Sequence, residues 1–200
     1  MQLNTDLTGL FGITLAIVAL LARLPRVGAL PLRRKAGVLG GAIIVLSIPL
    51  WGVSPAGFVR GMTGDLSIST LVLLTLALVR LLSGHALAGE VNRHAMLKAI
   101  AIAALLFYPF ALGVSMFDPY RLGYGNLWFM AVLLGLAVWC SLRYSMVLAS
   151  CIALAVAAWT CGWYESPNLW DYLLDPWLAI YAIAVQGKNW LARWKGRVHA

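Results

Sequence analysis

Polar and aromatic side chains gather in three segments of an otherwise apolar chain, at residues 54–67, 117–126 and 163–177. Their types suit recognition of a sugar or a lipid headgroup, because aromatic faces stack on apolar ring surfaces, carboxylates accept hydroxyl protons and arginine binds phosphate in a fork. The candidate ligand-binding residues are Arg60, Asp65, Asp118, Tyr120, Arg121, Tyr124, Asn126, Glu165, Asn168, Trp170, Asp171 and Asp175. We expect them to form one surface on the outer side of a membrane.

A structural role explains many of the same residues. Asp65, Asp175 and Asn126 stand just before expected helices, as does Asp6 before the first one, and each side chain can cap exposed amides at the positive end of a helix. Asp118 precedes a proline and so opens a turn. These residues therefore have an explanation that needs no ligand.

The two outer arginines also allow a structural interpretation. Arg60 lies close to Asp65, and Arg121 lies close to Asp118, so each can form a simple ion pair. Structural ion pairs cluster charges as readily as binding sites do. We favour the structural interpretation over a pocket, and both remain open.

Catalysis and metal binding have no recognisable pattern here. The three polar segments hold no histidine or cysteine, no G-x-S-x-G motif and no carboxylate pair with a spacing that specifies metal chemistry. His85, His94 and His199 fall in segments expected on the cytoplasmic side, where they suit solvated loops rather than a haem or metal site. We therefore expect no cofactor and no metal, and we lean against enzyme activity.

The composition sets the class of protein. Of 200 residues, 62% are hydrophobic and 11% charged, and the mean hydropathy is +0.86, whereas soluble domains are about 45–50% apolar and about 25% charged. This balance excludes a soluble nucleotide-binding fold or nucleic-acid module. It predicts an all-α integral membrane protein with a single domain over residues 1–200.

The uncharged stretches predict a bundle of about seven transmembrane helices, at about 20 residues for each span. The spans are expected at residues 7–24, 37–53, 66–83, 97–117, 126–142, 145–163 and 176–192, with a short interfacial helix at 167–174. With the N-terminus outside and the C-terminus inside, only Arg60 and Arg121 of the 15 Lys and Arg residues lie outside, in agreement with the positive-inside rule. We expect a multi-pass location in a bacterial inner membrane.

Polar groups inside the expected spans are few. Ion-coupled transporters normally carry an ionisable side chain near the membrane midplane, and no expected span has one there. Gly37 and Gly41 form a G-x-x-x-G motif, which we interpret as close helix packing within the chain rather than dimerisation. Arg23 and Arg80 end two short apolar runs, and we interpret them as side chains that reach the membrane surface.

These observations predict a non-catalytic component of envelope biogenesis. Its outer, periplasmic face would bind a lipid-linked or glycan-like ligand or a membrane enzyme partner, and its other partner is the bilayer. Nucleic acid is not expected as a partner. One alternative is a small transporter or flippase for a neutral or lipid substrate. Another is a membrane-embedded transferase or hydrolase with an outward-facing site of carboxylates and arginine.

Overall fold

The computed structural model describes residues 2–50, 52–87, 89–143 and 145–198, and these residues form an all-helical fold. The elements are α1 (Gln2–Arg23), α2 (Pro25–Gly28), α3 (Leu32–Ser47), α4 (Pro55–Thr63), α5 (Ile68–Ser83), α6 (Glu90–Ala111), the 3-10 helix η1 (Pro119–Gly123), α7 (Leu127–Leu142), α8 (Met146–Thr160), α9 (Leu169–Leu173) and α10 (Pro176–Val198). His199 lies outside the described residues.

Two helices are long and apolar enough to cross a membrane, at Asp6–Arg23 in α1 and Val91–Ala111 in α6. The apolar helices α5, α7 and α8 have 16, 16 and 15 residues. At about 1.5 Å per residue they are about 22–24 Å long, less than the hydrocarbon thickness of about 30 Å. Seven spans are therefore not confirmed, and the fold supports the coarser statement of an all-α chain with two candidate spans.

Helix boundaries differ from the expected ones in the first half of the chain. The expected helix at 37–53 is α3, which begins earlier, after Pro31, and ends at Ser47. It ends there because Ile48 precedes Pro49 and has an extended backbone, with φ −74° and ψ 123°, as is usual for a residue before proline. Helix α4 lies in a segment where no helix was expected, and Ser54 caps it by accepting a hydrogen bond from Gly57 N at 3.1 Å.

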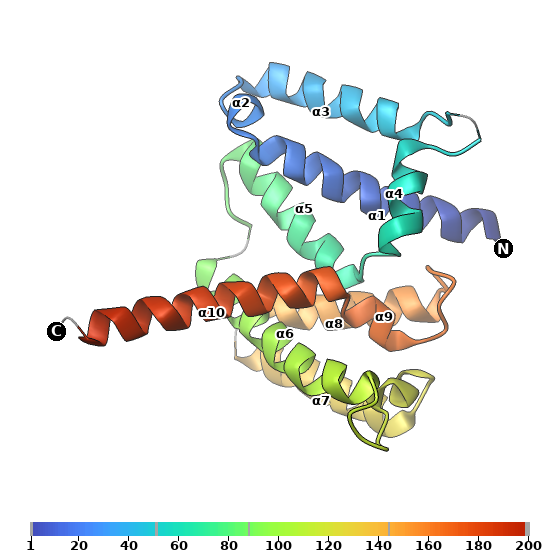
Figure 1. Ribbon diagram of the computed structural model, residues 1–200, viewed down its shortest axis with the longest axis vertical. Coiled ribbons are helices and arrows are strands. Elements are labelled where there is room, and N and C mark those ends of the chain that lie inside the picture. The colour runs from blue at the N-terminus through green and yellow to red at the C-terminus, as the bar shows by residue number, and fades with distance from the viewer. Residues whose placement is uncertain (1, 51, 88, 144, 199–200) are drawn as a thin grey trace.

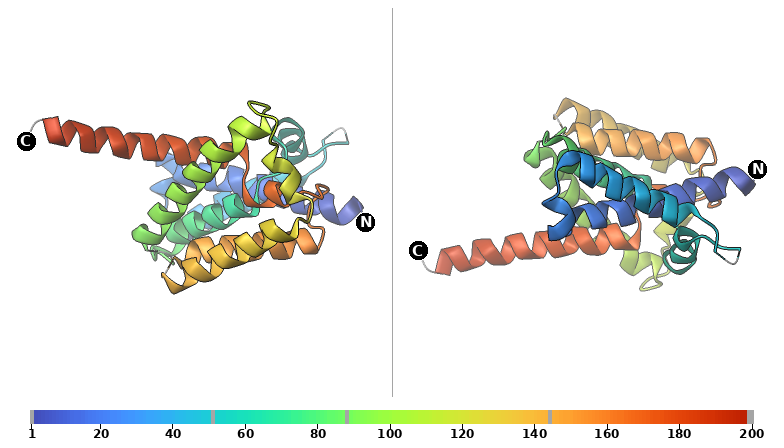
Figure 2. Two further views of the ribbon diagram at one scale, coloured as in Figure 1. Left: turned by 90° about the horizontal axis from the view of Figure 1, so that it is seen from below. Right: turned by 90° about the horizontal axis from the view of Figure 1, so that it is seen from above.

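The long helices run between two opposite ends of the fold, at the left and right of Figure 1. We call the end that holds α4, η1 and α9 the α9 end, and the end that holds α2 the α2 end. Helices α3 and α5 pack on α1, while α10 and α8 pack on α6, and α7 packs on α8. Helix α10 continues past the other helices at the α2 end (Figure 2).

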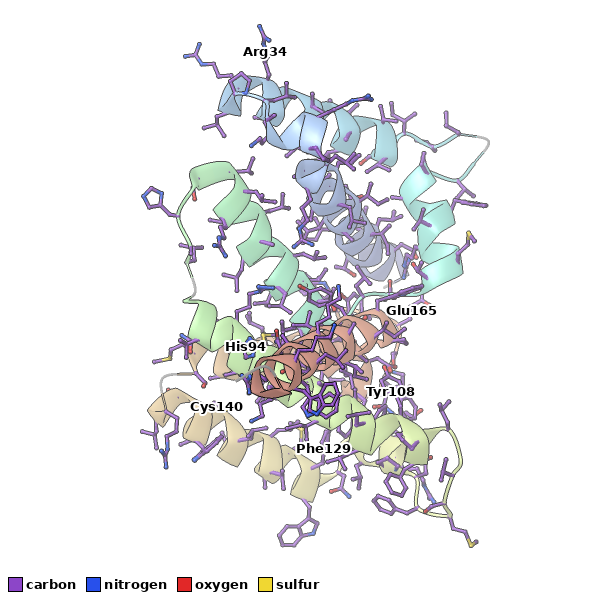
Figure 3. The ribbon with its side chains drawn as sticks, turned by 60° about the vertical axis from the view of Figure 1, so that its left-hand side comes forward. Arg34, His94, Tyr108, Phe129, Cys140 and Glu165 are labelled. Carbon is purple, nitrogen blue, oxygen red and sulfur yellow. The ribbon has the colours of Figure 1, made fainter. Side chains whose placement is uncertain are left out.

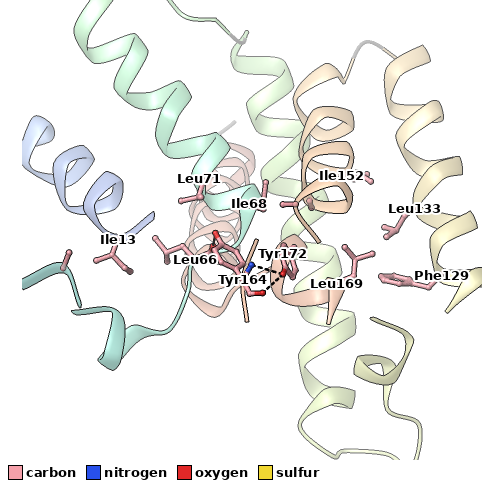
Figure 4. Packing of buried hydrophobic residues seen from close by; sticks show 13 residues of the cluster. Ile13, Leu66, Ile68, Leu71, Phe129, Leu133, Ile152, Tyr164, Leu169 and Tyr172 are labelled. Carbon is pink, nitrogen blue, oxygen red and sulfur yellow. Dashed lines mark hydrogen bonds between the residues drawn. The ribbon is translucent and has the colours of Figure 1, made fainter. Parts of the chain in front are cut away.

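Three clusters of buried side chains hold these helices together. The first, near the α9 end, joins α1, α4, α5, α7, α8 and α9 and includes Ile13, Leu66, Phe129, Tyr164 and Tyr172 (Figure 4). The second joins α6, α8 and α10, and the third joins α1, α3 and α5. The first cluster lies beneath the polar segments at the α9 end, so it positions them.

The glycines of α3 do not pack as expected. A Cβ atom added at Gly37, Gly40 or Gly41 would meet no described atom within 4 Å, and Gly37 and Gly41 are exposed. The prediction that the motif packs within the chain is therefore wrong: α3 contacts α1 through another face, which contains the buried Leu39.

This open space leads to a stability prediction. Replacing Gly41 with alanine should raise the free energy of unfolding by about 0.5–1 kcal/mol, because alanine costs less backbone entropy in a helix and nothing obstructs its methyl group. The midpoint of unfolding, followed by helical circular dichroism of the purified protein, measures the change. A clear loss of stability would show that another chain or a neighbouring segment packs against this glycine.

Candidate functional site

Arg60 is held at the α9 end by two carboxylates. Its Nε and Nη2 donate to Asp65 Oδ1 and Oδ2 at 2.6 and 3.1 Å, and its Nη1 donates to Asp6 Oδ1 at 2.8 Å. Its side chain is 17% exposed. The hydrogen bond to Asp65 is the main cause of an Arg60 pKa above its usual value, and burial opposes the rise. Forked pairs of this kind are strong and fix geometry.

A glycine of α1 makes room for this ion pair. A Cβ atom at Gly9 would lie 2.2 Å from Arg60 Nε and 2.3 Å from Asp65 Oδ1. The pair therefore lies directly against the backbone of α1, and it joins α1, α4 and the segment that leads into α5.

Two expected helix caps are wrong because of this pair. Asp65 was expected to cap the helix that begins near residue 66, but its carboxylate binds Arg60, and Ser67 caps α5 by accepting from Thr70 N at 3.2 Å. Asp6 was expected before the first helix, but α1 already begins at Gln2. In both positions, the ion pair with Arg60 replaces the local cap.

Asp175 ties two helix N-termini together, and it is 3% exposed. Its Oδ1 accepts from Leu178 N at 2.9 Å, which confirms the expected cap of α10. Its Oδ2 accepts from Ser67 N at 2.9 Å, from Ser67 Oγ at 2.6 Å and from Thr70 Oγ1. The negative charge lies where the positive ends of α5 and α10 meet, which favours it electrostatically.

Asp171 joins the polar segments around η1 and α9. Its Oδ2 accepts from Tyr120 Oη at 2.9 Å and from Ser166 Oγ at 2.5 Å. Asn168 Nδ2 donates to Tyr120 O at 2.9 Å, and Trp170 Nε1 donates to Pro119 O at 3.0 Å. Burial, followed by the hydrogen bond to Asp171, raises the pKa of Tyr120 above its usual value.

The remaining predicted residues lie at the same end in simpler surroundings. Asp118 opens η1 by accepting from Tyr120 N at 2.9 Å, and Asn126 caps α7 by accepting from Phe129 N at 3.1 Å, both as expected. Arg121 is exposed, and its expected ion pair with Asp118 is not formed in the described part of the chain. Glu165 and Tyr124 are also exposed.

The predicted residues thus lie at one end, but only part of them bond to one another, in three separate groups around Arg60, Asp175 and Asp171. None of them lines the cavity between α1, α5 and α10 that is described below. Several partners of these groups were missed, among them Ser67, Thr70 and Ser166. The S-x-x-T spacing of Ser67 and Thr70 is a local capping signal, whereas their bonds to Asp175 join residues 105 or more positions apart.

A cavity with a volume of about 650 Å³ lies between α1, α5 and the first turns of α10. Apolar side chains such as Ile17, Leu73 and Ala77 line its middle. Thr63 and Trp177 lie at its α9 end. Because Thr70 and Arg80 both line it, the cavity follows α5 for about 15 Å at 1.5 Å per residue.

Three arginines line the cavity at its α2 end: Arg23 from the end of α1, Arg80 from the last turn of α5 and Arg93 from the first turn of α6. Arg93 Nη2 donates to the hydroxyl of Tyr181, another lining residue on α10, at 3.1 Å. The sequence predicted that Arg23, Arg80 and Arg93 all lie on the cytoplasmic side of a membrane. It carried no signal that they share a cavity, because they belong to three different helices whose packing no local spacing encodes.

No group of three or more His, Cys, Asp and Glu side chains in the described residues is arranged to hold a metal ion. The chain matches no family model, no curated protein and no solved structure.

Proposed function

We propose that this chain is a non-catalytic, multi-pass protein of a bacterial inner membrane, and that it binds a lipid or lipid-linked ligand for envelope biogenesis. The observation that carries the proposal is the cavity between α1, α5 and α10, which is apolar along its length and polar at both ends. Pockets of about 300–1,000 Å³ with apolar walls and a few placed polar groups are typical ligand sites. An acyl chain has the shape and polarity of this space.

The outer surface of the helices supports a membrane location. Large apolar side chains are exposed on α7, including Leu127 at 83%, Trp128 at 82% and Leu134 at 67%. Others are exposed on α3 and α6. Water-soluble monomers rarely expose apolar patches of this extent, whereas lipid tails solvate them without cost.

The α9 end supports a role for the outer face in this proposal. Its segments are held in one conformation by Arg60, Asp171 and Asp175, so the exposed Arg121 and Glu165 project from a prearranged surface. Such a surface suits the polar part of a lipid-linked ligand or a membrane enzyme partner, because less conformational entropy is lost on binding.

Filling the cavity tests the proposal. Replacing Ala77 with tryptophan should lower the amount of lipid that copurifies by about tenfold, because the indole occupies space that the ligand needs. Mass spectrometry of lipids extracted from detergent-purified protein gives the ratio. Ala131→Trp is the matched control, since Ala131 is exposed on α7 and does not line the cavity. Equal lipid content in the two variants would contradict the proposal.

A flippase is the second candidate, favoured by the extent of the cavity from Thr63 and Trp177 to the three arginines. A flippase must move its lipid between leaflets, whereas a binding protein need not. Reconstituted vesicles with a fluorescent lipid in one leaflet separate the two functions. Fast loss of leaflet asymmetry, abolished by Ala77→Trp, would replace binding with transport as the function.

A further inference from the structure

The cavity is chemically asymmetric. Its α2 end is lined by Arg23, Arg80 and Arg93, and the lining side chains that the structure describes include no aspartate or glutamate. The middle is apolar, and the polar side-chain groups described at the far end are the hydroxyls of Thr63 and Thr70 and the indole of Trp177. A ligand that complements this space carries a negative charge at one end and a hydrocarbon chain along the rest.

The three arginines come from three different helices that line the same cavity. They come from the last residue of α1, the last turn of α5 and the first turn of α6, and Tyr181 of α10 holds one of them. Guanidinium groups bind phosphate oxygens with paired, charge-assisted hydrogen bonds, and several directed at one point recognise a phosphate group better than a carboxylate or a hydroxyl.

The sidedness of the chain indicates which leaflet supplies the ligand. The arginines lie at the α2 end, which the distribution of lysine and arginine assigns to the cytoplasm. The cytoplasmic leaflet carries anionic lipids, and basic residues close to it are attracted to them. The apolar length of about 15 Å along α5 then receives an acyl chain.

We propose that this cavity binds one anionic phospholipid of the cytoplasmic leaflet, with its phosphate at Arg23, Arg80 and Arg93 and an acyl chain along α5 toward Thr70. This inference rests on the proposed function and deepens it, since it names the ligand class and the headgroup-binding residues.

Native mass spectrometry of the full-length protein with equal amounts of phosphatidylglycerol and phosphatidylcholine tests the inference. The wild-type protein should retain one phosphatidylglycerol with a preference of about tenfold or more. Both lipids carry a phosphodiester, but the choline cation of phosphatidylcholine offsets its negative charge and is repelled by the arginines. Arg80→Gln combined with Arg93→Gln should remove most of that preference. Arg34→Gln is the control, because Arg34 is an exposed cation of α3, well away from α10 (Figure 3), and does not line the cavity.

A conservative variant distinguishes loss of the phosphate contact from loss of folding. Arg80→Lys keeps the charge but not the fork, so it should fold as the wild type does and show an intermediate preference. Inorganic phosphate should not replace the lipid at equal concentration, because it lacks the chain that fills the apolar part. Loss of the bound lipid when inorganic phosphate is added at equal concentration would overturn the lipid assignment.

The outcomes separate this inference from the proposed function. One outcome is that Ala77→Trp lowers the lipid content, but the wild-type protein binds phosphatidylglycerol and phosphatidylcholine equally. The arginine assignment then fails, and lipid binding stands. If the wild type loses every lipid on detergent exchange, the bound lipid is annular only, and both proposals fail. If the Arg80 and Arg93 double variant keeps the wild-type preference, the phosphate does not lie at these side chains.

Discussion

Replacing Asp175 with alanine is expected to lower the free energy of unfolding by about 3–5 kcal/mol, the range for breaking a buried charged network. The substitution leaves Ser67 N, Ser67 Oγ, Thr70 Oγ1 and Leu178 N without their shared acceptor in a place where Asp175 is 3% exposed. It also removes the negative charge between two helix N-termini. Unfolding of the purified protein, followed by helical circular dichroism, measures the loss.

Two further variants serve as controls for the Asp175→Ala measurement. Asp175→Asn keeps the shape and one acceptor oxygen, so it should recover part of the stability. Glu165→Ala removes an exposed carboxylate from the same end of the molecule and should change stability by less than about 0.5 kcal/mol. If Asp175→Ala and Glu165→Ala are equally mild, Asp175 does not tie α5 to α10.

Replacing Gly123 with alanine is expected to lower the free energy of unfolding by about 1–3 kcal/mol, because the added methyl group overpacks its surroundings. An added Cβ would lie 1.8 Å from Asn168 Oδ1 and 2.8 Å from Trp170 Cδ1. Asn168 is fully buried, and its side chain bonds both Tyr120 O and Trp170 N. The clash therefore disturbs the contact between η1 and α9.

The neighbours of Gly123 have little freedom to move aside. The Trp170 ring lies between Phe107 and Phe129, with ring centroids 4.4 and 4.7 Å away. Gly61→Ala provides the comparison, since a Cβ at Gly61 would meet no described atom within 4 Å. We expect Gly123→Ala to change the tryptophan fluorescence and to lower the unfolding midpoint. We expect neither change for Gly61→Ala. An unchanged midpoint would mean that η1 and α9 do not pack this closely.

Local signals predicted the N-terminal ends of two helices correctly. Asp175 followed by Pro176 predicted the start of α10, and Asn126 predicted the cap of α7. These succeed because a cap involves residues three positions apart and needs no tertiary partner. The end of α3 before Pro49 was also readable from the residue that precedes the proline, although it was expected later.

The amino-acid order alone established an apolar, all-helical chain whose polar segments gather at one end, because helix propensity, capping and hydropathy act over a few neighbouring residues. Folding in three dimensions selected the partners: Asp65 binds Arg60 instead of capping α5, and Asp175 receives donors from α5. It also brought Arg23, Arg80 and Arg93 around one cavity. Contacts between residues far apart in the chain depend on how the helices pack, and no spacing along a single helix encodes that arrangement.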